Sequence, residues 1–340
     1  MAVTLTDVAK AAGVSASTVS RTLSRPERVD AATRDKIFRE IARLGYQPNL
    51  AARSLITGRT GNLGVVVPDL ANPFFPDLVR AVQLRAHQRG FTVLLVDSDE
   101  DPAAELGLVV SLAPQVDGIV LCGARMSNDE LTKAQQLAPI MLINRIAPGI
   151  PAVTIDNAGG TRQAVRHLRA LRHRRIGFVG GPVTSRSHQQ RLAGARAAAE
   201  EFGMELIDLG SVAPSFGGGS AAADAVLLAE VSAVLAYNDV IAIGLMHRLV
   251  SYGIEVPGEI SVIGFDDIAL GEMSHPALTT VRYPRELAGQ SAVNDLLDLI
   301  GGDGSGPVDG TGREPLPTEL IIRGSTTAFH THLEETHVKG

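Results

Sequence analysis

Beyond residue 61 the chain alternates short, continuously apolar runs with stretches of helical periodicity, and this alternation is the feature that most limits its fold. Strands that are apolar on both faces are typical of parallel sheets covered by helices on both sides. The stretch is long for one core, so we predict two α/β lobes, with ligands bound between them beyond the carboxyl ends of the strands. The predicted strands are LGVVV, FTVLLV, GIVL, IMLI, AVTI, RIGFV, SAVLA and ISVIGF, and the predicted helices include 75–89, 104–113, 158–171 and 189–202.

The first residues predict two short helices joined by a tight turn. Thr4 precedes the first helix, with Asp7 three positions further on as in a capping box, and Gly13 ends it. Ser15 is the N-cap candidate for a second helix over residues 16–23. The short, glycine-containing turn between them is typical of a helix-turn-helix.

A third helix is predicted from near Asp30, with Ile37, Ile41 and Leu44 on one face and Gly45 at its end. Val8, Val14 and Val19 are the predicted core residues of the first two helices. The alternative to a helix-turn-helix is a generic three-helix bundle.

Charge is distributed unevenly along the chain. The net charge is −6, but residues 1–60 hold ten Lys/Arg and five Asp/Glu, a net of +5, which leaves −11 for the rest. A basic head on an acidic body can approach phosphates with one face only. The outward positions of the second helix are small or hydrogen-bonding, with one arginine, so they can enter a DNA groove.

The runs VTLTDVAKAAGVSASTVSRTLS, VDAATR and LGYQPNLAARSL resemble the head of the LacI/GalR family of transcriptional regulators. The resemblance implies that Ala16, Ser17 and Arg21 read bases and that Thr18 and Ser20 lie nearer the DNA backbone. Ala16 and Ser17 are small, so direct readout at their bases is expected to be weak. Thr4 and Ser15 complete the DNA contacts predicted for this head.

Residues 48–61 are predicted to form a hinge helix and linker. Such a helix is too short to be stable alone, and the resemblance implies that it folds when two chains meet on a palindromic operator. Leu55 falls at the family's minor-groove wedge, with an ordinary buried leucine as the alternative. Asn49, Ala52 and Arg53 are the other predicted contacts, with Arg53 on a phosphate.

Segments from PDLANPFF to LPTELIIRGST extend the resemblance over about residues 3–328. It implies a periplasmic-binding-protein-like core after a helix-turn-helix domain at 1–47, with three chain crossings between the lobes. The core is expected at 62–329, with lobe 1 at about 62–157 and 284–314, lobe 2 at about 158–281 and 315–329, and a flexible tail at 330–340.

Polar and aromatic residues at or after the strand ends are the predicted effector contacts. Their chemistry suits a polyhydroxylated ring: a guanidinium bridges hydroxyls, a carboxylate accepts from them, and an aromatic ring covers the apolar face. The resemblance places Arg191, Asn238 and Asp266 at positions that commonly hold effector. The full set is Asp69, Asn72, Phe74, Phe75, Asn144, Ser185, Ser187, Arg191, Phe216, Asn238 and Asp266.

For several of these residues a structural role is the alternative. Asp69 could cap the following helix, and Phe74 and Phe216 could belong to the core. Asp156 and Asp267 are predicted to be structural caps.

Two departures from the family pattern limit what can be transferred. Asn144 stands where an aspartate is often found, and an amide donates as well as accepts, so a particular effector cannot be carried over. Residues 330–340 show no heptad pattern, so the family's tetramerising helix is not expected and a homodimer is the simplest assembly.

Other classes of protein are disfavoured. The single Cys122 permits no disulfide framework or multi-cysteine metal site, and no nucleotide-binding glycine motif or catalytic triad can be assigned, so we expect no enzyme, metal or cofactor. No signal peptide or membrane span is recognised, which favours a cytoplasmic regulator over an exported solute-binding protein. A sugar effector is favoured, and a nucleoside, a purine or a protein co-regulator remains an alternative.

Overall fold

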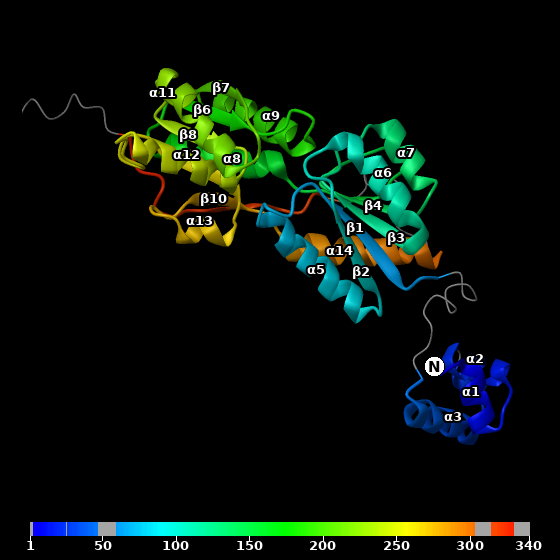
Figure 1. Cartoon of the computed structure of the whole chain (residues 1–340). Helices are drawn as coiled ribbons and strands as arrows, with labels where there is room; N and C mark the ends of the chain where they lie inside the picture. Colours follow the sequence, from blue (N-terminus) through cyan, green and yellow to red (C-terminus); the bar gives the residue numbers. More distant parts are fainter. Residues whose placement is uncertain (1–2, 25, 47–58, 303–313, 330–340) are drawn as a thin grey trace, which may run out of the picture. The chain divides into compact units, whose positions relative to one another are not determined.

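The computed structural model describes residues 3–24, 26–46, 59–302 and 314–329, which fall into two compact units (Figure 1). The first unit spans residues 1–60 and the second residues 61–340, and each is described by itself. The predicted hinge helix and tail lie outside the described residues.

The head is a small helical unit formed by α1 (Leu5–Ala12), α2 (Ala16–Ser24), a 3-10 turn η1 (Pro26–Arg28) and α3 (Ala31–Leu44). The predicted capping box is confirmed, because Thr4 and Asp7 bond each other reciprocally. The third helix starts near Asp30 as predicted, and the Asp30 carboxylate accepts a hydrogen bond from the Thr33 N–H at 3.1 Å. Gly13 and Gly45 end α1 and α3 in the left-handed conformation.

The head has one small core. Val8, Val19 and Ile37 are fully buried, and Val14 and Ile41 pack against them. Burying these side chains uses the inner faces of all three helices, so the outer face of α2 is left to solvent.

The first sheet of the second unit is parallel, in the order β2-β1-β3-β4-β5 (Figure 1). Alternate strand residues face opposite helical layers, so Val65 and Val120 pack with α5 and α14, whereas Val66 and Leu121 pack with α6 and α7. The strands are β1 (Asn62–Val67), β2 (Thr92–Asp97), β3 (Gly118–Cys122), β4 (Ile140–Ile143) and β5 (Ala152–Val153), and the helices are α5 (Phe74–Gln88), α6 (Pro102–Leu112), η2 (Ala113–Gln115), α7 (Asn128–Gln135) and α14 (Arg285–Gly301). We call this sheet, together with its helices, lobe 1.

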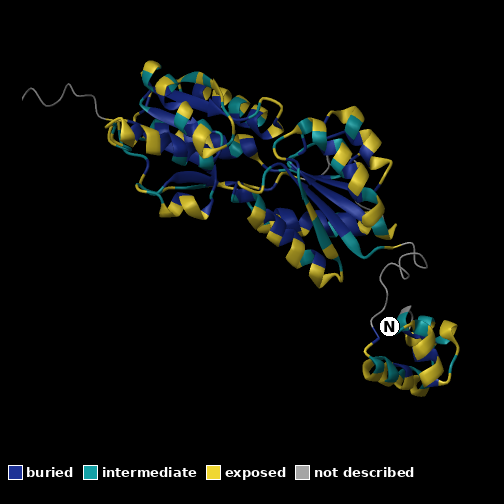
Figure 2. Ribbon diagram, viewed as in Figure 1, coloured by how far each residue is buried: buried dark blue, intermediate teal, exposed yellow. Residues whose placement is uncertain are grey.

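The second sheet has the order β11-β10-β9-β8-β6-β7, parallel except for the antiparallel β10–β11 pair. Helices again cover both faces, and Figure 2 shows buried strands beneath helices whose outer surfaces are exposed. The strands are β6 (Arg175–Gly180), β7 (Glu205–Ser211), β8 (Ala233–Ala236), β9 (Ser261–Asp266), β10 (Thr279–Arg282) and β11 (Glu319–Ile321), and the helices are α8 (Asn157–Ala170), α9 (Arg186–Glu201), α10 (Phe216–Ala221), α11 (Ala223–Leu228), α12 (Asp239–Ser251) and α13 (Ala269–Met273). We call this sheet, together with its helices, lobe 2.

The chain passes between the lobes after β5, after β10 and again before β11. The first and last of these passages lie side by side, because Ile155 and Leu316 form a parallel bridge and the backbone N–H of Asp156 donates to the Leu316 carbonyl at 3.0 Å. These passages bring the carboxyl ends of strands from both lobes toward one another.

The predicted fold class is confirmed, and the eight predicted apolar runs all contain strands. Three strands were not among those runs: β7, β10 and β11. Strands β7 and β11 are the edge strands of the lobe 2 sheet and have partly exposed patterns, so they lack a continuous apolar signal. Strand β10 has the sequence Thr-Thr-Val-Arg. Its buried residues include two threonines, so it also lacks a continuous apolar run.

Candidate functional sites: a helix face and an interlobe pocket

The outer face of α2 carries the residues predicted to contact DNA. Ala16, Ser17 and Arg21 are exposed, and Thr18 and Ser20 are half-buried. Within the described part of the chain, Arg21 makes no ion pair or hydrogen bond, so its guanidinium is available to a base or phosphate.

Ser15 and Thr4 hold the starts of α2 and α1, respectively. The Ser15 hydroxyl accepts a hydrogen bond from the Thr18 N–H at 3.1 Å and lies 2.8 Å from the hydroxyls of Ser17 and Thr18. Thr4 is exposed at the start of α1. The other predicted DNA contacts, Asn49, Ala52, Arg53 and Leu55, lie outside the described residues.

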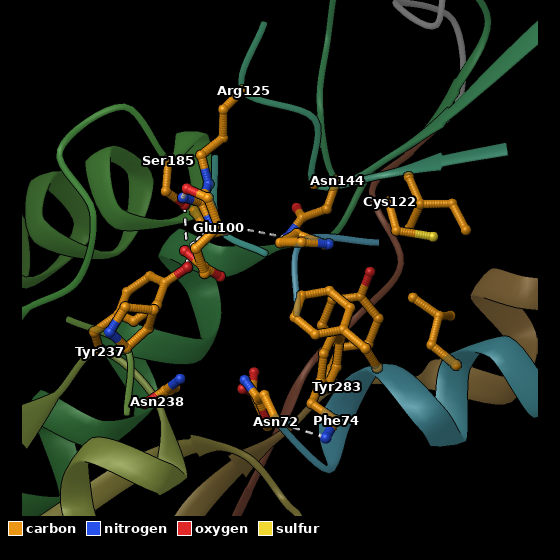
Figure 3. Close-up of a pocket in the computed structure, with 18 of the residues that line it drawn as sticks. Asn72, Phe74, Glu100, Cys122, Arg125, Asn144, Ser185, Tyr237, Asn238 and Tyr283 are labelled. Atoms are coloured by element: carbon orange, nitrogen blue, oxygen red, sulfur yellow. Dashed lines mark hydrogen bonds and ion pairs between the residues drawn. The ribbon is translucent and has the colours of Figure 1, made fainter. Parts of the chain in front are cut away.

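A pocket lies between the lobes of the second unit, at the carboxyl ends of their strands (Figure 3). It holds about 560 Å³ of space not occupied by atoms, part of it open to solvent. Nine of the eleven predicted effector residues line it: Asn72, Phe74, Phe75, Asn144, Ser185, Ser187, Arg191, Asn238 and Asp266.

Arg191 is the most heavily engaged side chain of the pocket and is 4% exposed. Its Nε donates to Asn157 Oδ1 at 3.0 Å, and its Nη1 donates to the Tyr237 carbonyl at 2.5 Å. Its Nη2 lies 3.4 Å from Asp266 Oδ1, and its guanidinium carbon lies 3.5 Å from the centre of the Phe265 ring. These contacts fix the guanidinium as part of the wall.

Asp266 is buried opposite Arg191 at the end of β9. Burial raises its pKa to about 7, and the attraction of Arg191 only partly opposes that shift. Its backbone is in an unusual conformation with φ 120°, and its carbonyl accepts a 2.7 Å hydrogen bond from Arg285 of lobe 1. The carboxyl therefore faces the pocket from a constrained position.

Asn144 connects the lobes across the pocket. It follows β4 in lobe 1 with φ 57°, a left-handed conformation that asparagine tolerates. Its Nδ2 donates to Ser187 Oγ at 2.8 Å, and its Oδ1 accepts from Asn157 Nδ2 at 2.9 Å, and both partners belong to lobe 2 helices. The amide thus uses both its donor and its acceptor, which a carboxylate could not do.

Three other polar residues at the pocket hold helix starts. Ser185 caps α9 and its hydroxyl lies 3.1 Å from the Tyr237 hydroxyl, and Asn238 caps α12 through a 2.9 Å bond from the Ile241 N–H to its Oδ1. Asn72 Oδ1 accepts from the Phe74 N–H at 3.1 Å. Because the caps use only the oxygens, the Nδ2 groups of both asparagines remain for a ligand.

Aromatic rings form two sides of the pocket. Phe74 packs edge-on against Phe75 and Tyr283, with ring centres 5.0 and 4.9 Å apart. Figure 3 shows Phe74 and Tyr283 on one side and Tyr237 on the other. The arrangement can cover the apolar faces of a ring.

Two predicted effector residues are not among those that line the pocket. The Asp69 carboxylate accepts from the Ala71 N–H at 2.7 Å and so caps the turn before α5. Phe216 starts α10, is 45% exposed and packs against His247 at 5.3 Å between ring centres. Asp156 caps α8 as predicted, whereas the prediction for Asp267 is wrong: it starts no helix and instead pairs with Arg282 and Arg323.

Sequence reasoning missed four prominent lining residues: Glu100, Arg125, Tyr237 and Tyr283. All four follow the carboxyl ends of strands β2, β3, β8 and β10. Tyr237 directly follows strand β8 and precedes Asn238, so the expectation that residues after strand ends line the pocket also applies to it. Tyr283 was missed because β10 itself was missed.

Among the described residues, no group of three or more His, Cys, Asp or Glu side chains could hold a metal ion. In the same residues no helix is both long and apolar enough to cross a membrane.

The chain combines a helical head, which exposes small residues and one arginine, with a two-lobed core that has a pocket between its lobes. This combination is that of a DNA-binding regulator with a periplasmic-binding-protein-like domain. Residues 4–49 match the family described as bacterial regulatory proteins, lacI family, and residues 165–326 match the periplasmic binding protein-like domain. The chain belongs to the LacI family of transcriptional regulators.

Full-length relatives support this assignment. The transcriptional regulator DegA of Bacillus subtilis is 33% identical over 97% of this chain and 100% of its own length. The crystal structure of the lac repressor dimer bound to operator and the anti-inducer ONPF is 29% identical, with a TM-score of 0.84 over 96% of this chain and 100% of that one. The complex of the regulator CelR with cellobiose is 32% identical, with a TM-score of 0.69 over 95% and 99% of the two chains. These relatives are transcriptional regulators rather than enzymes.

Proposed function

We propose that this protein is a repressor whose binding to operator DNA is controlled by a sugar or sugar derivative held between the two core lobes. The observation that carries the proposal is that nine side chains predicted from strand ends and family resemblance converge on one interlobe pocket. Polar groups from both lobes reach the same space, so a ligand there changes the free energy of one lobe arrangement relative to another.

On the DNA side, we propose that α2 enters the major groove, with Ala16, Ser17 and Arg21 toward the bases and Thr18 and Ser20 toward the backbone. The exposure of this face and the operator-bound lac repressor support the assignment. The minor-groove role of Leu55 remains a prediction from sequence. Because such binding neutralises phosphates, operator affinity should fall steeply with salt.

On the effector side, the pocket offers amide donors, carboxylate acceptors and aromatic faces, the combination that recognises a hydroxylated ring. CelR, a relative with this fold, binds cellobiose in its solved complex. A nucleoside is the second candidate, because Tyr237 and the Phe74–Tyr283 pair can also contact a planar base.

We further propose that two chains pair through their cores on a palindromic operator; the lac repressor is a dimer in its operator-bound structure, which supports a dimer here. The paired faces would include α5 and α14 of lobe 1, where Leu84 is 56% and Leu287 is 48% exposed and both line one groove. Apolar side chains of this size at the surface are expected in an interface core.

The interlobe contacts suggest how effector binding reaches the head. Asn144 and Arg285 of lobe 1 hold lobe 2 by hydrogen bonds at the edge of the pocket. A ligand that strengthens or replaces these contacts shifts the lobe angle, and the pairing of lobe 1 across the dimer transmits this shift to the two heads.

The proposal is tested by thermal unfolding of the full chain against sugars, sugar phosphates, polyols, nucleosides and purines. A ligand at about one hundred times its dissociation constant stabilises the fold by roughly 2.7 kcal/mol, or several degrees. Any compound that stabilises is then added to an operator-binding titration.

Two variants locate the site. Arg191→Ala should abolish the stabilisation, whereas Arg196→Ala, on the exposed face of the same helix, should keep it. A stabilising compound that leaves operator affinity unchanged would contradict the proposed control, and one whose effect survives Arg191→Ala would contradict the proposed site.

A further inference from the structure

The lobe 1 wall of the pocket contains an ion pair, Glu100–Arg125, which sequence reasoning did not find. Arg125 Nη2 pairs with the Glu100 carboxylate, and Nη1 donates to the Glu100 carbonyl at 3.3 Å. The Arg125 side chain is 7% exposed and that of Glu100 26%, so the carboxylate is the more accessible partner from the pocket. In Figure 3 the Arg125 side chain extends toward Glu100.

Backbone contacts hold both partners of this pair in place. The Arg125 N–H donates to the buried carboxylate of Glu105 at 2.9 and 3.1 Å. Glu100 has φ 60° and follows Asp99 with φ 49°, and its N–H donates to the Pro68 carbonyl at 2.6 Å. Two consecutive non-glycine residues in the left-handed region cost free energy, so the surrounding structure must favour this placement.

The second arginine of the pocket is also committed to the protein. Each of the three nitrogens of Arg191 donates to a protein oxygen, of Asn157, Tyr237 or Asp266. Its face is covered by the Phe265 ring. Each lining arginine is therefore already paired with a protein carboxylate, Arg125 with Glu100 and Arg191 with Asp266, and a phosphate group would have to compete with that carboxylate for the guanidinium.

Several pocket groups without positive charge have hydrogen-bonding atoms to spare. Among the described residues, the Nδ2 groups of Asn72 and Asn238 and the hydroxyl of Tyr283 have no hydrogen-bond partner. Asp266 Oδ2 and Glu100 Oε1 also remain as acceptors. Carboxylate oxygens accept from hydroxyls and repel anions, and amides donate to hydroxyl or carbonyl oxygens.

We infer that this pocket takes a neutral, polyhydroxylated ring and rejects its phosphorylated or carboxylated forms, and that the Glu100–Arg125 pair enforces this selection by keeping Arg125 neutralised. The inference rests on the proposed function for the identity of the site and adds the charge class of the ligand. Removing the Glu100 charge should convert the lobe 1 wall into an anion site.

The first experiment uses inorganic phosphate as the probe on the full chain. Thermal unfolding is followed in phosphate and in chloride at equal ionic strength for the wild type, Glu100→Gln and Glu205→Gln. Glu205 pairs with Arg175 outside the pocket, so its variant also releases an arginine but at an exposed site. Phosphate bound to the basic head or acting as a general stabiliser affects all three proteins equally and cancels.

We expect Glu100→Gln to bind phosphate at least about tenfold more tightly than the wild type or Glu205→Gln, because a charge-assisted contact with Arg125 becomes available. Adding Arg125→Gln to Glu100→Gln should remove the gain, and circular dichroism checks that each variant is folded. An equal phosphate response in Glu100→Gln and Glu205→Gln would overturn the role of the pair.

The second experiment compares matched ligands on the wild type: ribose with ribose 5-phosphate, glucose with glucose 6-phosphate, and nucleosides with their 5′-monophosphates. No ester should stabilise the protein more than its neutral parent. An ester that binds more tightly, with the advantage lost in Arg125→Gln, would overturn the inference. If Glu100→Gln gains phosphate but no neutral compound alters operator affinity, the charge assignment stands and the proposed control of DNA binding fails.

Discussion

Single residues at the pocket serve two purposes at once. Asn238 and Asn72 use their oxygens to satisfy backbone N–H groups at helix starts and keep their Nδ2 groups for a ligand. Asn144 differs, because both ends of its amide are used by lobe 2. It therefore acts first as a bond between the lobes.

Asn144→Ala should lower the free energy of unfolding by about 2 kcal/mol, since two hydrogen bonds of about 1 kcal/mol each are lost. Alanine also tolerates the φ of 57° less well than asparagine does. Chemical denaturation measures the change. Gln136→Ala is the control, because Gln136 is exposed and its side chain makes no hydrogen bond among the described residues, so the change should alter stability by less than about 0.5 kcal/mol. Equal changes in the two variants would show that the bonds between the lobes contribute little.

Asp266 should make the protein less stable as pH rises toward neutrality. Its pKa is raised by burial from 3.8 to about 7, so the folded state binds a proton more tightly than the unfolded chain. The stability from that proton is complete below about pH 4 and is lost as pH rises through 7, at up to about 1.4 kcal/mol per pH unit. Asp266→Asn should remove this part of the slope.

Asp267→Asn is the matched control for that measurement. The Asp267 pKa is lowered, because its hydrogen bonds and ion pairs with Arg282 and Arg323 outweigh partial burial. The ionised form of Asp267 therefore stabilises the folded state above about pH 4, and this stabilisation is lost in acid. The pH dependence thus has the opposite sign to that of Asp266. Parallel pH profiles for the wild type and Asp266→Asn would contradict the raised pKa.

At the level of elements, the packing of α10 on α12 depends on glycine. A Cβ at Gly244 would lie 2.1 Å from the Phe216 carbonyl oxygen, and one at Gly219 would lie 2.1 Å from the Ile241 carbonyl oxygen. The two helices therefore meet backbone to backbone. The head is also built from short helices, and burying one face of each leaves the outer surface of α2 exposed.

Gly244→Ala should separate α10 from α12 and destabilise the protein by about 1–3 kcal/mol, because a backbone atom must move to admit the methyl group. Gly217→Ala on α10 is the control, since its Cβ would lie 4.0 Å from Ser215 Oγ, an ordinary contact distance. That control should be neutral or stabilising by up to about 1 kcal/mol through helix propensity. Thermal or chemical unfolding of both variants gives the comparison, and a neutral Gly244→Ala would contradict the close packing.

At the level of the whole molecule, an acidic core and a basic head are two compact units of one chain. If two cores pair through α5 and α14, two heads are brought to one palindromic site, and their phosphate contacts add. Operator affinity then depends on the exposed apolar residues of those helices, because they hold the two cores together.

Leu84→Glu together with Leu287→Glu should shift the protein from dimer to monomer in sedimentation experiments and lower operator affinity at least about tenfold. Each charge would have to be desolvated within the paired surface. Leu228→Glu is the control, because Leu228 is 85% exposed on α11 of lobe 2, away from the proposed face. A double variant that remains dimeric would place the pairing surface elsewhere.

Local signals in the sequence determined most of the head and the strand frame. The capping box at Thr4, the start of α3 near Asp30, its end at Gly45, and the apolar runs of β1 to β6, β8 and β9 depend on neighbours a few residues away, and each is predicted close to its observed position. Most of the pocket could also be anticipated, because residues that follow parallel strands gather at one edge of a sheet.

Only the tertiary structure decided which of these residues share the pocket and which charges remain available there. Glu100 and Arg125 are 25 residues apart, and Arg191 and Asp266 are 75 apart, so their pairing follows from sheet order and chain crossings. Phe216 and Asp69 carry suitable chemistry but satisfy contacts elsewhere. The physical reason is that caps and periodicity act within one element, whereas burial and charge pairing depend on elements that meet only after the whole chain has folded.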